Sequence, residues 1–330
     1  MFVRRKRGWE IPESHITPES FVLNRRRLLG AGAAGIGSLA LQGQSWFGFG
    51  GEQKLPDFSA GDPSLPLYPA MRSMRYRVDR ELTEEKIAVT YNNFYEFGSS
   101  KNVWQPAQKL DIRPWEIRID GMVEQERTIG IDELIKALSL EERTYRFRCV
   151  EAWAMTVPWT GMPMKQFVEF CKPLGSAKYL RMETFKNPDV ASGQRASWYP
   201  WPYVEGLAID EATNELALLA TGVYGKPLPR QMGSPIRLVV PWKYGFKNIK
   251  SIVRFSFTDQ RPKSFWEEIQ ATEYGFWANV NPKVPHPRWS QATEELIGKG
   301  GQRVPSQLFN GYADFVASLY SARESERLWT

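Results

Sequence analysis

Hydrophobic and polar residues alternate in several short stretches of this chain, as they do in strands with one buried face. In residues 115–119, Trp115, Ile117 and Ile119 alternate with charged residues, which predicts a half-buried strand. Residues 144–150 alternate in the same way and place Tyr145, Phe147 and Cys149 on one face. We expect further strands at residues 178–185, 236–240 and 251–257.

Other stretches repeat with the period of a helix. Ile131, Leu134, Ile135 and Leu138 recur at helical spacing, and acidic residues occupy the expected first turn. Shorter helices are expected at residues 165–171 and 210–220. Strands and helices do not alternate strictly enough for a Rossmann sheet, so the pattern predicts an α+β fold with a mixed sheet.

The first 41 residues have the features of an export signal. A basic stretch leads to Asn24-Arg-Arg-Arg-Leu-Leu29 and then to the apolar run 28–41, which is 14 residues long. A membrane-spanning helix needs about 20 residues, so this run is too short to span. The Arg-Arg-x-Leu-Leu pattern resembles a bacterial twin-arginine signal, which passes folded proteins to the twin-arginine translocation machinery and predicts a periplasmic location. The alternatives are an ordinary secretory signal and a disordered basic tail.

Removal of this segment changes how the composition is interpreted. The 330 residues carry a net charge of +6, but residues 1–41 hold seven basic and three acidic side chains, so about +2 remains. No basic surplus then favours nucleic acid as a partner. The Gly- and Pro-rich residues 42–75 are typical of a linker that wraps the surface, and residues 76–330 are expected to form one catalytic domain.

Histidine and cysteine are scarce, which limits the kinds of metal site. The chain has two His and two Cys, and His15 lies in the signal segment, which leaves His286 as the remaining imidazole. Zinc sites rich in His, haem with two His ligands and binuclear His-carboxylate sites therefore lack ligands. Cys149, at the end of a predicted strand, is a candidate soft ligand for a transition metal. An inert buried thiol and a disulfide with Cys171 are the alternatives, although Cys171 is expected in a helix core.

Several rare sequence blocks resemble one family. They are Asn92-Asn-Phe-Tyr-Glu-Phe97, Arg148-Cys-Val-Glu-Ala-Trp153, Tyr203-Val-Glu-Gly-Leu207 and Pro241-Trp-Lys-Tyr-Gly-Phe-Lys247, together with residues 274–282 and 286–294. These blocks resemble those in the catalytic subunit of the periplasmic molybdopterin-dependent methionine sulfoxide reductases. The resemblance implies a sulfite-oxidase-like fold that holds one molybdenum with one pyranopterin dithiolene, and it implies Cys149 as the thiolate ligand of the metal.

The resemblance also implies which residues bind the cofactor. They are Asn92, Tyr95, Glu96, Thr184, Arg237, Asn248, Ile249 and Lys250. Arginine and lysine suit the phosphate of molybdopterin, whereas amide, hydroxyl and main-chain groups suit its pterin edge. The family has a pocket asparagine where this chain has Met232, which cannot make that side-chain hydrogen bond.

Two further residues are candidates for catalysis. Asn93 is expected to orient a ligand of the metal, and Glu151, two residues after Cys149, is expected to relay protons. Ordinary structural hydrogen bonds are the alternative for both. Lys243 and Lys247 stay undecided between cofactor binding and a solvated basic face.

The function that the resemblance implies is reduction of methionine sulfoxide in oxidised periplasmic proteins, by transfer of the sulfoxide oxygen to the molybdenum centre. The chain has too few ligands for its own haem or iron–sulfur cluster, so electrons are expected from outside. The resemblance implies that a membrane haem-binding subunit supplies them. The alternatives are a sulfite dehydrogenase or a reductase of other small S- or N-oxides on the same cofactor, and an exported binding protein without a metal.

Overall fold

The structure is a computed structural model that describes residues 55–76 and 78–329, and each structural statement below refers to these residues. The expected signal segment and the first part of the expected linker lie outside them. The described residues belong to a single unit that begins at Leu55. The boundary expected at residue 76 stays a prediction.

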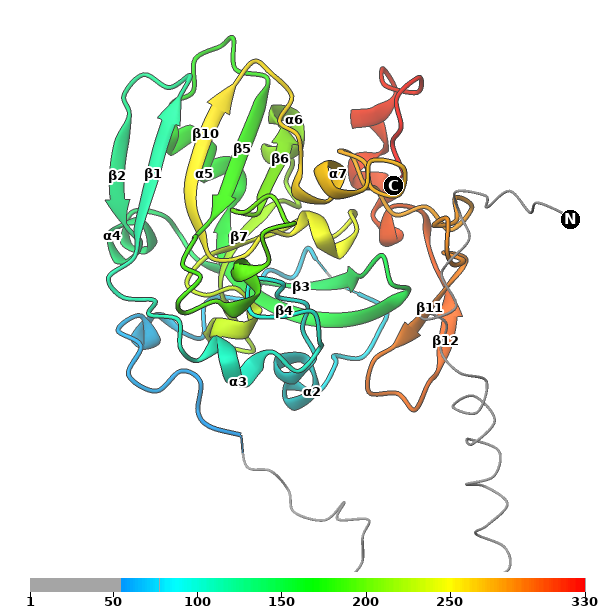
Figure 1. The fold of residues 1–330 in the computed structure, drawn as a ribbon, viewed down its shortest axis with the longest axis horizontal. Helices are drawn as coiled ribbons and strands as arrows, with labels where there is room; N and C mark the ends of the chain where they lie inside the picture. Colours follow the sequence, from blue (N-terminus) through cyan, green and yellow to red (C-terminus); the bar gives the residue numbers. More distant parts are fainter. Residues whose placement is uncertain (1–54, 77, 330) are drawn as a thin grey trace, which may run out of the picture. The chain divides into compact units, whose positions relative to one another are not determined.

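The first sheet is mixed, with five strands, and is seen from its face in Figure 1. Its strands, in spatial order, are β2 (Arg127–Gly130), β1 (Glu116–Gly121), β10 (Ile252–Thr258), β5 (Tyr179–Thr184) and β6 (Val204–Ala208). Strands β1 and β10 run parallel, and the other neighbours run antiparallel. Tyr179–Thr184 alternates between half-buried and buried positions, as the sequence pattern predicts.

The second sheet has seven strands and contains the long strand β4 (Trp153–Pro163) at its centre. The other strands are β3 (Glu141–Arg148), β7 (Leu218–Val223), β8 (Lys226–Pro227), β9 (Arg237–Val239), β11 (Thr293–Leu296) and β12 (Arg303–Pro305). Strand β3 pairs antiparallel with β4 from Glu141 to Arg148, so the two form a hairpin. All of β4 except Pro163 is buried, which is why its sequence is nearly continuously apolar.

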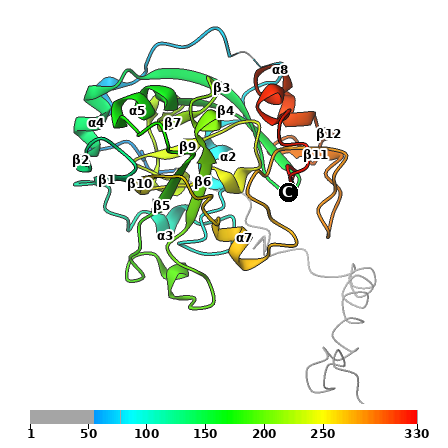
Figure 2. The same cartoon turned by 90° about the horizontal axis from the view of Figure 1, so that it is seen from above.

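Helices are short and surround the two sheets (Figure 2). They are α2 (Glu85–Thr90), α3 (Trp104–Ala107), α4 (Ile131–Ala137), α5 (Met164–Cys171), α6 (Ile209–Ala212), α7 (Phe265–Ile269) and α8 (Ala313–Val316). The 3-10 helices are η3 (Leu65–Leu67), η4 (Ser192–Arg195), η5 (Arg230–Met232), η6 (Gly245–Lys247), η7 (Leu308–Gly311) and η8 (Ala317–Tyr320). Phe167 of α5 packs on Phe255 of β10 with ring centroids 4.4 Å apart, which fixes α5 against the first sheet.

The α+β class with mixed sheets is confirmed, and one expected helix is wrong. Residues 210–220 form only the four-residue helix α6, after which Asn214 Oδ1 accepts a hydrogen bond from the backbone amide of Leu216 and turns the chain. Residues from Leu218 onward join the second sheet between β4 and β9, where they are fully buried. Pairing within the sheet therefore overrides the local helical pattern.

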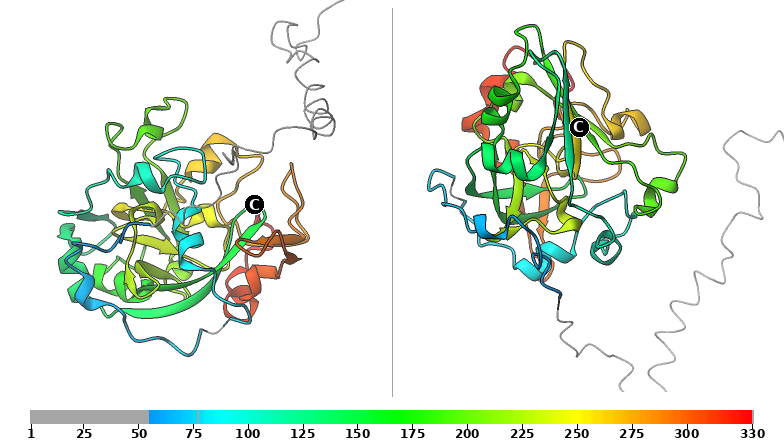
Figure 3. Two further views of the ribbon diagram at one scale, coloured as in Figure 1. Left: turned by 90° about the horizontal axis from the view of Figure 1, so that it is seen from below. Right: turned by 90° about the vertical axis from the view of Figure 1, so that its left-hand side faces the viewer.

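The turn between β3 and β4 lies where the second sheet meets two loops, and this place holds the candidate site. Two further views of the ribbon are given in Figure 3. Among the helices of the described residues, none combines the length and the apolar composition that a membrane crossing needs.

Candidate active site

A cavity of about 750 Å³ opens beside the turn between β3 and β4. Its walls include every predicted site residue except Thr184. The Trp- and Tyr-rich segments 197–203 and 265–277 contribute Tyr199, Tyr203, Trp266 and Tyr274. The sequence blocks that carry the family resemblance therefore come together around one cavity.

Cys149 lies in the turn of the hairpin, directly after β3. Its backbone amide donates to the carbonyl of Trp153 at 2.9 Å, and its carbonyl accepts from Ala152, whose φ of 63° turns the chain back into β4. The thiol is 5% exposed and is not in a disulfide, and Cys171 is a separate buried thiol in α5. The disulfide alternative is therefore wrong, and the helix-core position of Cys171 is confirmed.

The surroundings of Cys149 keep its thiol protonated in the absence of a metal. Burial, followed by the negative charge of Glu151, raises the pKa of Cys149 to about 12. Lys101 and Arg148 lower this pKa by smaller amounts. A metal ion held here would displace this proton, as metal ions do at coordinating thiols, and Cys149 would hold it through its sulfur.

Two arginines precede Cys149 in β3, and each pairs with a carboxylate. Arg148 is fully buried and pairs with Glu294 at 2.9 Å. Arg146 pairs with Asp79 on the other side of the strand. Arg148 also donates to the backbone carbonyl of Cys149, and its charge lowers the pKa of the thiol, so it stays close to the cysteine where β3 ends.

A loop from Asn92 to Lys101 brings polar groups to the thiol. The backbone amide of Asn92 donates to the carbonyl of Lys101 at 3.0 Å, which closes the loop on itself. Lys101 Nζ then donates to Asn93 Oδ1 at 2.6 Å, and Asn93 Nδ2 donates to Cys149 Sγ at 3.6 Å. Because a lysine has no acceptor, this bond fixes the Asn93 amide with its NH₂ group toward the thiol.

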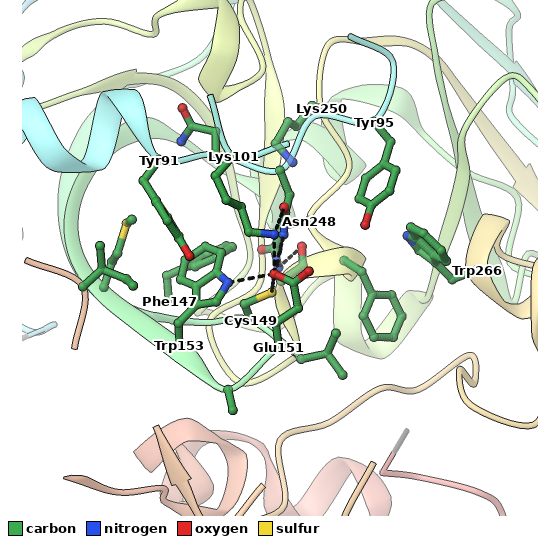
Figure 4. A pocket seen from close by; sticks show the side chains of 18 of the residues that line it. Tyr91, Tyr95, Lys101, Phe147, Cys149, Glu151, Trp153, Asn248, Lys250 and Trp266 are labelled. Carbon is green, nitrogen blue, oxygen red and sulfur yellow. Dashed lines mark hydrogen bonds and ion pairs between the residues drawn. The ribbon is translucent and has the colours of Figure 1, made fainter. Parts of the chain in front are cut away.

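Glu151 lies at the centre of this cluster of polar side chains, and Figure 4 shows it with Lys101 and Cys149. Its Oε2 atom lies 2.6 Å from Lys101 Nζ, 2.9 Å from Trp153 Nε1 and 3.7 Å from Cys149 Sγ. Burial raises the pKa of Glu151, but the bonds and charge of Lys101 and the bonds from Trp153 and Asn93 outweigh it, so the pKa is lowered. Glu151 reaches the thiol because the chain turns after Cys149, not because the two residues share a strand face.

Another wall of the cavity carries two buried cations that form no ion pair with a carboxylate of the described residues, although the charge of Glu96 acts on one of them, Lys250. Arg237 is 3% exposed and donates to the backbone carbonyls of Met232, Leu238 and Asn248, and burial lowers its pKa to about 9. Lys250 forms no hydrogen bond through Nζ within the described residues, and burial lowers its pKa.

Asn92 has a buried Oδ1 atom that no donor of the described residues reaches. Buried polar groups are normally satisfied, so this atom, with Arg237 and Lys250, indicates a ligand that carries negative charge and both donors and acceptors.

Glu96 and Tyr95 complete the wall near Lys250. Burial raises the pKa of Glu96, and the positive charge of Lys250 opposes that shift. The ring of Tyr95 meets Trp266 edge-on at 4.8 Å, and Trp266 contacts Tyr274 at 5.2 Å. Figure 4 shows Tyr95 and Trp266 together on the side of the cavity away from Tyr91 and Phe147. The opening is therefore bordered largely by aromatic rings.

Three predicted cofactor residues use their polar groups within the protein. Thr184 is not in the wall, because its hydroxyl donates to the carbonyls of Lys250 at 2.8 Å and Ser251 at 3.2 Å. Asn248 lines the cavity, but its side-chain amide bonds to backbone groups on both sides. Ile249 uses its amide and its carbonyl in backbone hydrogen bonds. The cofactor roles of these three residues stay predictions.

The structure also places Lys243, Lys247 and Met232, to which the sequence assigned no definite role. Lys243 and Lys247 are fully buried and pair with Glu211 at 2.5 Å and Glu205 at 2.6 Å, so neither forms a solvated basic face. Met232 lines the cavity with its side chain and holds Arg237 through its backbone carbonyl at 2.9 Å.

Comparison with known proteins identifies the family. Residues 103–266 match the model of the oxidoreductase molybdopterin binding domain. The protein-methionine-sulfoxide reductase catalytic subunit of Xanthomonas campestris pv. campestris is 43% identical over 326 residues, which are 96% of this chain and 97% of that protein. The subunit of the same name from Xanthomonas axonopodis pv. citri is 44% identical over 327 residues, again 96% and 97% of the two chains.

This chain belongs to the family of protein-methionine-sulfoxide reductase catalytic subunits. It carries the molybdopterin-binding oxidoreductase domain of that family, which confirms the expected cofactor class. A more distant structure, the sulfane dehydrogenase SoxCD from Paracoccus pantotrophus, is 18% identical with a TM-score of 0.40, over 47% of this chain and 41% of its own.

The residues of this reductase subunit fit the cofactor. Molybdopterin brings two sulfur ligands and a phosphate, so it needs few protein ligands and a cationic wall. Within the described residues no three His, Cys, Asp or Glu side chains cluster as a metal site, whereas Cys149 offers one sulfur to the cavity. Gly245 lets its backbone pass close to the hairpin that carries Cys149, because a Cβ atom there would lie 2.7 Å from Phe147 Cζ and 3.5 Å from the Cα atom of Cys149.

Sequence reasoning missed some residues of the reductase site. Lys101 received no role, although Gly98-Ser-Ser100 before it predicts a turn that returns the chain toward Asn93. Trp153 was identified only as part of a sequence block, and its indole N–H proves to bind Glu151. Arg288 and Trp289, which also line the cavity, were identified only as part of the block 286–294 and received no role.

Proposed function

We propose that this protein reduces methionine sulfoxide in oxidised proteins to methionine, with a molybdenum–molybdopterin centre held in the cavity beside Cys149. The observation that carries the proposal is the pairing of a free thiol on one wall with buried Arg237 and Lys250 on another. A bound molybdenum centre supplies two-electron oxygen-atom transfer. The protein supplies position, charge and protons.

Each wall has a separate task in this proposal. Cys149 binds the metal through its sulfur, and Arg237 and Lys250 bind the phosphate of the cofactor with Asn92 against its pterin. The negative charge of the phosphate balances the positive charge of these buried cations. It therefore raises the lowered pKa of Lys250 back toward its usual value. The cofactor therefore stabilises the pocket that holds it.

Glu151, beside the thiol, supplies protons in this proposal. Reduction of a sulfoxide consumes two protons and releases water, so a proton donor must lie close to the sulfoxide oxygen. Glu151 is 32% exposed at its side chain and lies between Cys149 and Lys101, which connects the site with solvent. Asn93 presents N–H groups to the same space and is placed to orient the oxygen of the substrate.

Molybdenum analysis together with a reduced-dye assay tests the proposal. We expect about one molybdenum per chain and oxidation of the dye with methionine sulfoxide. Absence of bound molybdenum would overturn the proposal and favour a binding protein. Turnover of sulfite without turnover of methionine sulfoxide would favour a dehydrogenase.

A pair of cysteine variants locates the chemistry. Cys149→Ser should abolish activity, because it removes the ligand of the metal. Cys171→Ser is the matched control: it changes an equally buried thiol in α5, away from the cavity, and should retain activity. Equal loss in both variants would show that the effect is on folding.

The place of this activity in the cell follows from the predicted signal. We propose that the protein is exported in folded form through the twin-arginine machinery to the periplasm, and that it draws electrons from a membrane haem-binding subunit. The length and basic start of residues 1–41 support export. Detection of the shortened protein in the periplasmic fraction, and its loss when Arg25 and Arg26 are changed to Lys, is the expected result.

A further inference from the structure

Two methionines of this chain differ from the others in exposure. Met71 is 85% exposed and Met74 is 61% exposed. The other methionines of the described residues are buried or, in the case of Met122, half-buried. Among the described residues, the two strongly exposed thioethers therefore lie on one short surface segment.

Exposure decides which methionines are oxidised first. A peroxide transfers one oxygen atom to the thioether sulfur and is itself reduced to water, and accessible sulfurs react faster than buried ones. At an exposed position the polar sulfoxide stays in water, so the fold tolerates it. In the core the same change would disrupt packing. The oxidised chain is therefore expected to stay folded with its sulfoxides at residues 71 and 74.

The segment that carries these methionines is tied far from the cavity of its own molecule. The backbone amide of Ser73 donates to the carbonyl of Glu142, and the amide of Glu142 donates to the carbonyl of Met71, both at 2.8 Å. Glu142 lies at the start of β3, and Cys149 follows the other end of that strand. Seven residues of extended strand separate the two points by about 23 Å at about 3.3 Å per residue.

A methionine side chain cannot cover that distance while the segment stays bonded to β3. Reduction of these sulfoxides by the same molecule is therefore excluded by the geometry. A second molecule can approach the segment, because both side chains project into solvent.

We propose that Met71 and Met74 are sites of reversible oxidation, and that a second copy of this chain reduces their sulfoxides. This inference rests on the proposed function. Reduction of each sulfoxide takes two electrons and two protons, breaks the S–O bond and releases water, with the electrons supplied by the donor that serves the reductase. The protein thereby maintains its own surface while it repairs others.

The test uses one form of the chain as substrate and another as catalyst. The Cys149→Ser variant is treated with hydrogen peroxide, freed of oxidant and mixed with a trace of untreated wild-type enzyme and reduced dye. Mass spectrometry follows the gain and loss of one oxygen in each methionine peptide. We expect Met71 and Met74 to gain oxygen before the buried methionines and to lose it at a rate proportional to the wild-type enzyme.

A parallel assay with free methionine sulfoxide separates this inference from the function. If free sulfoxide is reduced while the sulfoxides at 71 and 74 persist, the inference is overturned and the function stands. If free sulfoxide is not reduced either, the proposed function fails and the inference fails with it. Oxidation of Met155 or Met162 before Met71 would also overturn the inference.

Two controls keep the result interpretable. If Cys149→Ser does not fold, isotopically heavy wild-type protein replaces it as substrate, and a dilution series distinguishes the two routes. Repair between molecules slows on dilution, whereas repair within one molecule does not, and a rate that ignores dilution would contradict the proposal. The double variant Met71→Leu, Met74→Leu should gain no oxygen in this segment and should keep full activity on free sulfoxide.

Discussion

Replacement of Lys101 by methionine tests most directly whether the polar side chains beside Cys149 orient one another for activity. The lysine makes two short contacts, 2.6 Å to Asn93 Oδ1 and 2.6 Å to Glu151 Oε2, and methionine retains its length without its charge. Without the lysine, nothing fixes which end of the Asn93 amide faces the thiol. Glu151 also loses the cation that holds it in place.

The expected effect on activity is larger than the effect on stability. The side chains of Lys101 and Glu151 are 27% and 32% exposed, and partly exposed ion pairs contribute about 1 kcal/mol or less to stability. Loss of groups that orient the ligands of a metal costs about 10- to 100-fold in activity or metal affinity. We therefore expect kcat to fall by that factor while the unfolding temperature changes by only about 2–4 °C.

The assay measures kcat and KM with reduced dye and free methionine sulfoxide, together with molybdenum content and thermal unfolding. Lys101→Arg should recover part of the activity, because arginine retains the charge and the donors. Lys226→Met is the matched control, since Lys226 pairs with Glu85 at 2.8 Å on the surface and should leave kcat unchanged. A Lys101→Met enzyme with full molybdenum content and kcat within threefold of wild type would refute the reasoning.

Three further predictions concern buried residues that support the fold and the walls of the cavity. Asp120 is buried with its pKa lowered, because hydrogen bonds from a serine and two arginines outweigh the effect of burial. Asp120→Asn should lower the free energy of unfolding by about 2 kcal/mol at pH 7. In urea unfolding the difference should shrink as the pH falls below about 4, the value in the unfolded chain, and should be lost only below the lowered pKa of the folded state. Glu294→Gln leaves the guanidinium of Arg148 buried without its counter-charge and should cost about 3–5 kcal/mol by the same measurement; a cost below 1 kcal/mol would contradict this account. Gly245→Ala should lower molybdenum content by pushing an aromatic ring into the cavity, whereas Gly130→Ala, whose added Cβ atom meets nothing within 4 Å, should not.

Part of the fold could be predicted because some of its strands, such as β1 and β5, have one buried and one more exposed face. Residues 115–119 and 178–185 follow that pattern in β1 and β5. Residues 144–150 were also placed in a strand, but both faces of β3 are largely buried, and Arg148 is more buried than Phe147. The failure at residues 210–220 has a physical cause. A buried strand and a buried helix segment have the same apolar composition, and only the neighbouring strands β4 and β9 decide between them.

Only part of the candidate site could be predicted from the sequence. Cys149 and its sequence neighbours were identified because they form a rare block, and the structure places them on the cavity wall. Lys101 was not identified, because its importance comes from the closure of a loop onto Asn93, which leaves no periodic pattern. Thr184 shows the opposite case, since its hydroxyl supports the backbone of Lys250 and does not face the cavity.

The cavity takes its walls from parts of the chain that are distant in sequence: the loop at 92–101, the hairpin turn at 149–153 and the segment at 237–250. No short piece of the chain can therefore bind the cofactor, and loading must follow folding of the whole domain. All of the binding energy then opposes global unfolding, and a ligand at 1,000 times its Kd adds about 4 kcal/mol. Quality control is thus inherent in the architecture, because a chain that has misfolded in any of the three segments cannot acquire molybdenum.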